Sequence, residues 1–365
     1  FKLKKSVLAD LLLDIVSKNQ NYGKNQIGKN KRVLVEFVSA NPTGPLTVGH
    51  GRGAMLGDTV SNILKWNGYD VQREYYFNNA GRQMRILGQS VHARYLELLK
   101  EKSEFPEGGY EGKYIYEIAQ KIIDLHQGSL IDNPKNIIFK DSAESHIFKD
   151  IKSTLNRLGL NFDSFFNEHT LYESGEIENV INSLRDKNLI YEKDGATWFS
   201  AKKVGRENDR VLIKSSGEPT YRLPDIAYHK DKFNRNYDLI VDVFGADHMD
   251  AFPDVMAAID NLDCDSKKMR VLIHQFVTIT REGKPVKMST RKANFVTLDE
   301  LIDEVGADVV RYFFIMRGMN SHLNFDLDLA KNQSDENPVF YLQYAHARVC
   351  NIIKRGEAFD HLLNP

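Results

Sequence analysis

Residues 33–58 constrain the fold most, because there an apolar run breaks into a turn rich in Pro and Gly and then restarts with helical spacing. Val33 to Val38 is short, β-branched and bounded by turn residues, so it predicts a buried strand of a parallel sheet. The helix predicted after it begins at Gly49 and ends near Gly68. A strand, a glycine-bearing turn and a helix in this order present free backbone N–H groups and a positive dipole end to an anion.

The helix start carries the tripeptide Gly49-His50-Gly51. One interpretation is a phosphate site, in which His50 donates a hydrogen bond and Gly49 leaves room for a flat ring or a ribose. The other is a histidine that only caps the helix. The tripeptide by itself leaves both interpretations open.

Charge and cysteine content exclude several classes of protein. The 365 residues carry 49 basic and 50 acidic side chains, a net charge of −1, so any contact with a nucleic acid must be a local patch. The two cysteines, Cys264 and Cys350, lack zinc-ligand spacing and indicate a reducing compartment. No run of 18 apolar residues and no signal peptide is present, so we expect a cytoplasmic protein without a membrane segment.

The rest of the chain alternates predicted strands and helices, with an amphipathic helix over Phe1–Val16 at its beginning. This alternation predicts an α/β protein with a doubly wound parallel sheet, interrupted by a mostly helical insertion. A hairpin is expected across residues 193–195. The predicted strands are Val71–Phe77, Val211–Lys214, Leu239–Phe244 and Val271–Ile279; the predicted helices are Ala80–Lys100, Tyr114–Leu125, His146–Leu158, Glu176–Lys187, Ile226–Phe233, Met249–Leu262, 299–317 and Asn337–Lys354.

A basic loop follows the last predicted strand of the sheet. Lys284, Lys287, Arg291 and Lys292 lie within nine residues, and their repulsion must be offset by solvent or by an anion. A solvated face is the usual explanation for such a run. We favour a loop that closes on a triphosphate, because ligands of doubly wound sheets bind at the carboxyl ends of the strands.

Several segments, taken together, resemble the bacterial-type arginyl-tRNA synthetase family of class I. They are residues 35–58, TYRLPDIAYH at 220–229, FGADH at 244–248, KMSTRKANFVTLDEL at 287–301 and NPVFYLQYAHAR at 337–348. The resemblance covers roughly residues 33–355. Matches in this order and context support one another far more than any single motif would.

The resemblance implies a Rossmann-like catalytic domain with a connective insertion, followed by a helical anticodon-binding domain, and a chain truncated at both ends. The expected parts are a remnant of an N-terminal tRNA-contacting domain with its linker at 1–32, the first catalytic half at 33–100, the insertion at 101–207, the second catalytic half at 208–298, a helical junction at 299–336 and the start of the anticodon domain at 337–365.

The family's reaction is implied in the same way. Arginine attacks the α-phosphate of ATP to give arginyl-adenylate, and a terminal ribose hydroxyl of tRNA(Arg) then takes the arginyl group. Both steps depend on positioning and charge stabilisation rather than on a protein nucleophile. We expect Mg²⁺ to bind through the phosphates, with no metal-ligating residues of the protein, and we expect a monomer.

Two family signatures map onto this chain with departures. The first corresponds to Thr47-Val48-Gly49-His50 and the second to Lys287-Met288-Ser289-Thr290. The resemblance makes His50, Lys287 and Thr47 the catalytic candidates. It makes Gly49, His50, Gly245, His248, Lys287 and Ser289 the ATP-binding candidates. Thr47 replaces a histidine and Thr290 a lysine, so a catalytically weakened paralogue that still binds nucleotide or tRNA is the alternative.

Recognition of arginine follows partly from chemistry. A guanidinium is planar, permanently charged and rich in donors, so it requires a carboxylate and an aromatic or hydroxyl neighbour. Tyr221 and Asp225 meet this requirement, although a lone Asp in a first helical turn can simply complement the helix dipole. The resemblance adds Asn41 and Asp247 at the α-amino group and Glu36 as a wall of the arginine pocket. A synthetase for another amino acid is the second alternative.

Overall fold

The computed structural model describes residues 4–79, 81–286 and 296–357, and a five-stranded sheet lies at its centre. The strand order is β3-β2-β1-β7-β8, and every neighbouring pair is parallel. The strands are β1 (Arg32–Glu36), β2 (Asp70–Phe77), β3 (Ser164–Asn167), β7 (Leu239–Gly245) and β8 (Met269–His274). This order confirms the predicted doubly wound α/β class. Because it reverses between β1 and β7, a ligand crevice is expected at their carboxyl ends.

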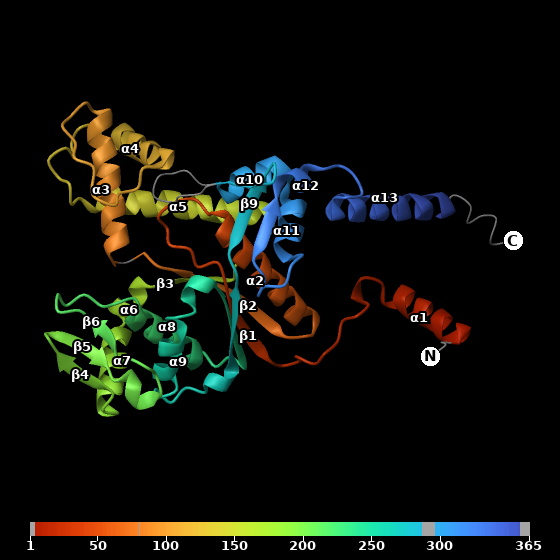
Figure 1. The fold of residues 1–365 in the computed structure, drawn as a ribbon, viewed down its shortest axis with the longest axis horizontal. Helices are drawn as coiled ribbons and strands as arrows, with labels where there is room; N and C mark the ends of the chain where they lie inside the picture. The colour runs from red at the N-terminus through yellow and green to blue at the C-terminus, as the bar shows by residue number, and fades with distance from the viewer. Residues whose placement is uncertain (1–3, 80, 287–295, 358–365) are drawn as a thin grey trace.

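Helices cover the sheet and follow its strands, as predicted (Figure 1). They include α2 (Val48–Trp66) after β1, α3 (Gly81–Leu98) after β2, α8 (Arg222–Asn234) before β7 and α9 (Phe252–Ile259) before β8. The helix predicted over Met249–Leu262 is shorter, because the 3₁₀ turn η3 (Ala246–His248) precedes α9. Helix α2 lies close to β1 because Gly57 faces Phe37, where an added Cβ would come within 2.1 Å of the ring.

One strand of the central sheet comes from the segment predicted to be an insertion. The edge strand β3 pairs with β2 in the register Glu74↔Ser164, so residues 164–167 belong to the sheet rather than to a separate helical block. Before it lie α4 (Lys113–His126) and α5 (Ile137–Arg157). Helix α5 begins nine residues earlier than predicted, because the Asn136 side chain caps it by accepting the Ile138 N–H at 3.0 Å.

A second, antiparallel sheet contains β4 (Ile190–Lys193), β5 (Ala196–Phe199) and β6 (Arg210–Ile213), and it lies beside α6 (His169–Glu173) and α7 (Glu176–Asp186). The predicted hairpin is confirmed. Its turn residues Asp194 and Gly195 both have positive φ, 53° and 72°, which suits a two-residue hairpin. The strand predicted at Val211–Lys214 exists as β6, but it pairs with β5 rather than with the central sheet.

The predicted strand Val271–Ile279 is two strands. β8 ends at His274, and β9 (Val277–Arg281) forms a third sheet with β10 (Lys284–Pro285) and β11 (Leu323–Asp326). The buried Arg52 of α2 accounts for the break, because its guanidinium binds the carbonyls of Gln275, Gly318 and Ser321 at 2.8–3.0 Å.

The helical region after β10 is also divided. The predicted helix 299–317 is split into α10 (Leu298–Val305) and α11 (Ala307–Ile315) by Gly306, whose φ is 83°. The remaining elements are α12 (Leu327–Lys331), α13 (Pro338–Glu357), α1 (Lys5–Lys18) and the 3₁₀ turns η1 (Asn19–Asn21), η2 (Ala201–Val204) and η4 (Ser266–Lys268). Figure 1 shows α1 and α13 projecting from the same side of the body.

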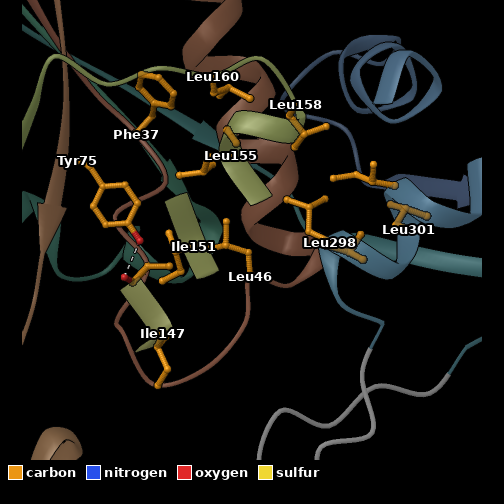
Figure 2. Packing of buried hydrophobic residues seen from close by; sticks show 14 of the residues in the cluster. Phe37, Leu46, Tyr75, Ile147, Ile151, Leu155, Leu158, Leu160, Leu298 and Leu301 are labelled. Carbon is orange, nitrogen blue, oxygen red and sulfur yellow. Dashed lines mark hydrogen bonds between the residues drawn. The ribbon is translucent and has the colours of Figure 1, made fainter. Parts of the chain in front are cut away.

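The main core joins segments that are far apart in the chain. Figure 2 shows the apolar face of α5, including Ile151 and Leu155, packed between the aromatic rings beside the sheet and Leu298 of α10. The Tyr75 hydroxyl in this core donates to the Ala40 carbonyl at 2.8 Å, which ties β2 to the loop after β1. The core therefore holds the loop that borders the crevice.

Candidate active site

A cavity of about 680 Å³ opens where the strand order reverses. Its walls come from the carboxyl ends of β1, β7 and β8, the start of α2 and the first turn of α8. It contains every site residue that was predicted within the described part of the chain: Glu36, Asn41, Thr47, Gly49, His50, Tyr221, Asp225, Gly245, Asp247 and His248. Residues more than 200 positions apart in the sequence, such as Glu36 and His248, therefore line one cavity.

His50 is both a capping residue and a candidate ligand donor. Its Nδ1 accepts the backbone N–H of Thr47 at 3.0 Å, and the Thr47 hydroxyl lies 3.2 Å from the same nitrogen. Burial lowers the pKa of His50 to about 4, partly opposed by Asp247, so the ring is neutral at pH 7. With Nδ1 as the acceptor, the proton lies on Nε2. The capping interpretation of the Gly-His-Gly tripeptide is thus confirmed, and the phosphate site remains a prediction for which the Nε2 proton is available.

The backbone around His50 leaves space on the cavity side. A Cβ on Gly49 would meet only the Thr47 Oγ1, at 3.7 Å, so the wall is open there. On the opposite wall Gly245 ends β7, and a Cβ on it would come within 2.5 Å of Asp247 Oδ1. Glycine at these two positions allows a ligand to approach the start of α2 and allows Asp247 to fold back onto the end of β7.

A strained turn follows β1 at the cavity wall. Val38 and Ser39 have φ values of 71° and 44°, a left-handed conformation that costs non-glycine residues about 1–3 kcal/mol each. Two hydrogen bonds hold it: the Ser39 hydroxyl donates to Glu36 Oε1 at 2.7 Å and accepts the Tyr76 N–H at 3.0 Å. The turn fixes the position of Glu36 at the base of the cavity.

Asp225 carries a carboxylate for which the described part of the chain supplies no ion-pair partner. It lies in the first turn of α8 and lines the cavity. Within the described residues no side chain donates a hydrogen bond to this carboxylate, and burial raises its pKa. Helix α8 begins at Arg222, four residues before the predicted start at Ile226, and this earlier start brings Asp225 into its first turn. Tyr221 immediately precedes the helix, is 57% exposed and lies at the cavity rim, with the Arg222 guanidinium 4.8 Å from the centre of its ring.

Glu36, by contrast, is already paired. The strand register places Glu74, Glu36 and Asp242 in one row across β2, β1 and β7. Helix α8 supplies the compensating charge: the fully buried Lys232 ammonium binds Glu36 and, at 2.8 Å, Asp242. Burial opposes the charge on Lys232, but the two carboxylates raise its pKa above the usual value. Glu36 can accept a hydrogen bond from a ligand, but its charge is balanced by Lys232.

The remaining predicted residues have polar surroundings at the rim. The Asn41 amide donates to Gln83 Oε1 at 2.8 Å. Asp247 Oδ2 lies 3.8 Å from His248 Nε2, and the His248 ring stacks on Phe244 at 5.0 Å between centroids. The His248 ring face therefore extends an aromatic wall of the cavity.

Several cavity residues were missed in the sequence. Tyr76 near the end of β2, Tyr228 and His229 on α8, and His274 at the end of β8 all line the cavity. His274 lies beside His50, and burial lowers its pKa. The sequence could have indicated the residues at strand ends by their position, because the carboxyl ends of parallel strands meet at one edge of the sheet.

Lys287 and Ser289, and the neighbouring Thr290, Arg291 and Lys292, lie outside the described residues. Their assignment to the nucleotide remains a prediction. Elsewhere, in the described ranges, no group of three or more His, Cys, Asp or Glu side chains is arranged to hold a metal ion. None of the described helices is long and apolar enough to cross a membrane.

Comparisons with known proteins identify the family of the chain. The family described as tRNA synthetases class I (R), catalytic domain, matches residues 11–313. An arginine–tRNA ligase of Desulfotalea psychrophila is 57% identical over 346 residues, which are 95% of this chain and 63% of that protein. Another, of Chlorobium phaeobacteroides, is 54% identical over 98% of this chain and 66% of its own length.

Solved structures show the same fold. A proposed arginyl-tRNA synthetase of Campylobacter jejuni superposes with a TM-score of 0.90 at 34% identity, covering 100% of this chain and 80% of that one. The arginyl-tRNA synthetase of Thermus thermophilus has a TM-score of 0.70 at 20% identity, covering 93% and 67%. The chain spans slightly less than two thirds of the length of the Desulfotalea relative. By its sequence and its fold, the chain belongs to the class I arginyl-tRNA synthetase family, of which it contains the catalytic domain.

Proposed function

We propose that this chain carries the catalytic centre of an arginine–tRNA ligase, which activates L-arginine with ATP and transfers it to the 3′ end of tRNA(Arg). The observation that carries the proposal is one cavity that is lined both by the start of α2 at His50, where the helix dipole favours an anion, and by the half-buried carboxylate of Asp225, which has no ion-pair partner among the described residues. A ligand that spans both must have an anionic and a cationic end. Arginyl-adenylate is such a molecule.

The nucleotide end is formed by the start of α2. Its free backbone N–H groups and dipole favour a phosphate, and neutral His50 donates through Nε2 without adding charge. Gly49 leaves room for the ribose or base, and Gly245 and His248 border the space opposite. Thr47, Lys287 and Ser289 complete the proposed phosphate contacts. Mg²⁺ would enter with the phosphates, whose oxygens are its preferred ligands.

The amino-acid end is formed by α8 and the loop after β1. Asp225 receives the guanidinium, whose donors match a carboxylate, and Tyr221 covers it from the rim. Asn41 and Asp247 hold the α-amino group, and Glu36 closes the base. This placement holds the arginine carboxylate against the α-phosphate, so the rate gain comes from positioning and from the charge stabilisation by His50 and the helix dipole.

Asp225→Asn tests the assignment of arginine. The change keeps the size of the side chain but turns one acceptor into a donor that faces the guanidinium's own donors. Loss of a buried charged partner costs about 2–5 kcal/mol, which is roughly 30-fold to several-thousand-fold in arginine affinity. Binding of ATP should remain within about twofold. Asp231→Asn, on the same helix but outside the cavity, is the matched control.

The measurement is arginine-dependent ATP–pyrophosphate exchange in the presence and absence of tRNA(Arg), with arginine titrations and melting temperatures of both variants. Exchange that saturates with arginine and is weakened selectively in Asp225→Asn supports the ligase. A chain that binds ATP but shows no exchange with any of the twenty amino acids supports the weakened paralogue, and exchange with another amino acid identifies a different synthetase.

Localisation and assembly belong to the same proposal. The two cysteines are free thiols, Cys264 half-buried and Cys350 exposed, which fits a reducing cytoplasm. A monomer in the cytoplasm is the form in which we propose that the enzyme acts. Light scattering of the purified chain measures its mass in solution.

A further inference from the structure

We propose that Tyr114 is a positioning residue for the reaction, because it holds the loop 40–47 between β1 and α2 in the place that sets Asn41 against the start of α2. The inference rests on the proposed function, since it takes arginine and ATP as the ligands. It gives a role to helix α4, none of whose residues lines the cavity. Tyr114 acts through the loop rather than by touching a substrate.

A hydrogen bond and a close packing contact join α4 to this loop. The Tyr114 hydroxyl donates to the Thr43 carbonyl at 2.6 Å. An added Cβ on Gly44 would come 3.0 Å from the same hydroxyl oxygen, and one on Gly112 would come within 2.1 Å of the ring. Neither glycine has a positive φ, so the close approach of the Tyr114 ring, and not the backbone conformation, explains glycine at both positions.

Helix α4 is a firm support for this hydroxyl. Its apolar face, which includes Ile115, Ile118 and Ile122, is buried in the main core. Tyr114 lies in the first turn of α4 and packs against the same core. A side chain held by close packing cannot follow a displaced loop, so the loop must come to Tyr114.

Tyr114 holds the middle of a loop that is also held near both ends. The Tyr75 hydroxyl donates to the Ala40 carbonyl at 2.8 Å, and the Leu298 N–H donates to the Leu46 carbonyl, also at 2.8 Å. These two bonds come from β2 and α10 and do not involve α4. Loss of the Tyr114 hydroxyl should therefore release the turn between them without detaching the loop.

A displacement of Thr43 also displaces Asn41. The Thr43 N–H donates to the Asn41 carbonyl at 2.8 Å, and Pro42 between them has a restricted backbone, so the three residues move as one turn. Asn41 lines the cavity and is the proposed contact of the arginine α-amino group. Tyr114 thus sets where this group lies relative to the phosphates, and hence the alignment of arginine with ATP.

The test uses a ligand that spans the cavity, the sulfamate analogue of arginyl-adenylate, beside arginine and ATP alone. Arginine by itself can follow a displaced Asn41 and ATP does not contact it, whereas the analogue is held at both ends. Tyr114→Phe removes the hydrogen bond but keeps the ring. Calorimetric titration into the full chain should show about five- to thirtyfold weaker binding of the analogue, and less than about twofold change for arginine and for ATP.

Gly44→Ala disturbs the same contact from the side of the loop. Its methyl group pushes against the Tyr114 ring, so the same selective loss is expected with Tyr114 intact. Tyr116→Phe is the matched control, since it makes the same chemical change two residues along α4, where the hydroxyl donates to Glu97 at 3.1 Å instead. Its affinities for all three ligands should stay within about twofold of the wild type.

A double-mutant cycle with Asn41→Ala distinguishes positioning from a general loss of structure. In the Asn41→Ala background, Tyr114→Phe should change the analogue affinity by less than about twofold, because the group that Tyr114 positions is already gone. The same weakening in both backgrounds would show that Tyr114 does not act through Asn41, and would overturn the inference.

Unchanged analogue affinity in folded Tyr114→Phe, or an equal loss in Tyr116→Phe, would also overturn the inference and leave the proposed function intact. A wild type that binds neither arginine nor ATP nor the analogue would overturn the proposed function, and this inference with it. Melting temperatures identify any variant that is unfolded. If Tyr114→Phe is unfolded, Gly44→Ala provides the same comparison.

Discussion

Replacing Lys232 by Met should destabilise the protein severely, because its ammonium is the charge that two buried carboxylates share. Lys232 and Asp242 are fully buried and Glu36 is 3% exposed. Lys232 Nζ binds Glu36 and lies 2.8 Å and 2.9 Å from the two oxygens of Asp242. Methionine has nearly the same length and fills the space, so the change removes the charge without opening a large cavity.

The magnitude follows from the strand register. Glu36 and Asp242 are direct neighbours on parallel strands, about 5 Å apart, and at an effective dielectric constant of about 20 their repulsion is about 3 kcal/mol. Removing one partner of a buried ion pair costs about 3–5 kcal/mol. His229 remains hydrogen-bonded to Asp242 at 2.9 Å, so Glu36 carries most of the uncompensated charge. We expect a loss of about 3–5 kcal/mol in the free energy of unfolding.

The direction of the pH dependence distinguishes this cause from poor packing. In the wild type, burial would raise the pKa of Asp242, but Lys232 and His229 hold it below the usual value, so its contribution is lost only below about pH 4. In Lys232→Met the folded carboxylates take up a proton more readily than the unfolded ones. The difference in the free energy of unfolding between Lys232→Met and the wild type should therefore shrink as the pH falls from 7 to 5. Over the same range the contribution of this charge cluster to the stability of the wild type should stay nearly constant.

Urea unfolding at pH 7 and pH 5 measures both effects. Lys230→Met, on the same helix with an ion pair to Glu176 at 4.0 Å, is the matched control and should cost less than about 1 kcal/mol. A loss in Lys232→Met below about 1 kcal/mol at pH 7, or a loss that grows towards pH 5, would refute the charge argument.

Two further predictions concern helix α2. Gly57→Ala should lower the free energy of unfolding by about 1–3 kcal/mol, because the methyl group meets the Phe37 ring, whereas Gly49→Ala should leave stability unchanged and weaken ATP binding measured by calorimetry. Equal stability losses in the two variants would contradict the packing argument. The wild type should lose stability as the pH falls from 6.5 to 4.5, because the imidazole of His50 binds a proton in the unfolded state but not in the folded state, where its pKa is about 4. His50→Gln removes this imidazole and should reduce the loss. Urea unfolding at the two pH values gives the free energy of unfolding of each protein. The loss between pH 6.5 and pH 4.5 should be larger in the wild type than in the variant by up to about 3 kcal/mol, and equal losses would contradict this role of His50.

Much of the fold could be predicted where short-range chemistry decides it. The strand, turn and helix around His50 follow from a β-branched run, turn residues and restored helical spacing, and the structure places them within a few residues of the prediction. The turn Asp194-Gly195 was predictable for the same reason, since both residues tolerate positive φ. The predicted residues around the cavity came together because strand ends of a doubly wound sheet converge.

Tertiary structure decided what has no local signal. β3 is four residues long and lies at the edge of the sheet, where it pairs with β2, about 90 positions earlier in the chain, and so short a segment does not by itself predict a strand. Lys232 reads as one more solvent-exposed charge of a polar helix, yet it neutralises Glu36, 196 positions away. Tyr76 and Glu168 likewise meet across 92 positions. Turns, caps and amphipathic spacing are set by neighbours along the chain, whereas strand pairing and the burial of charge depend on partners that only the folded chain brings together.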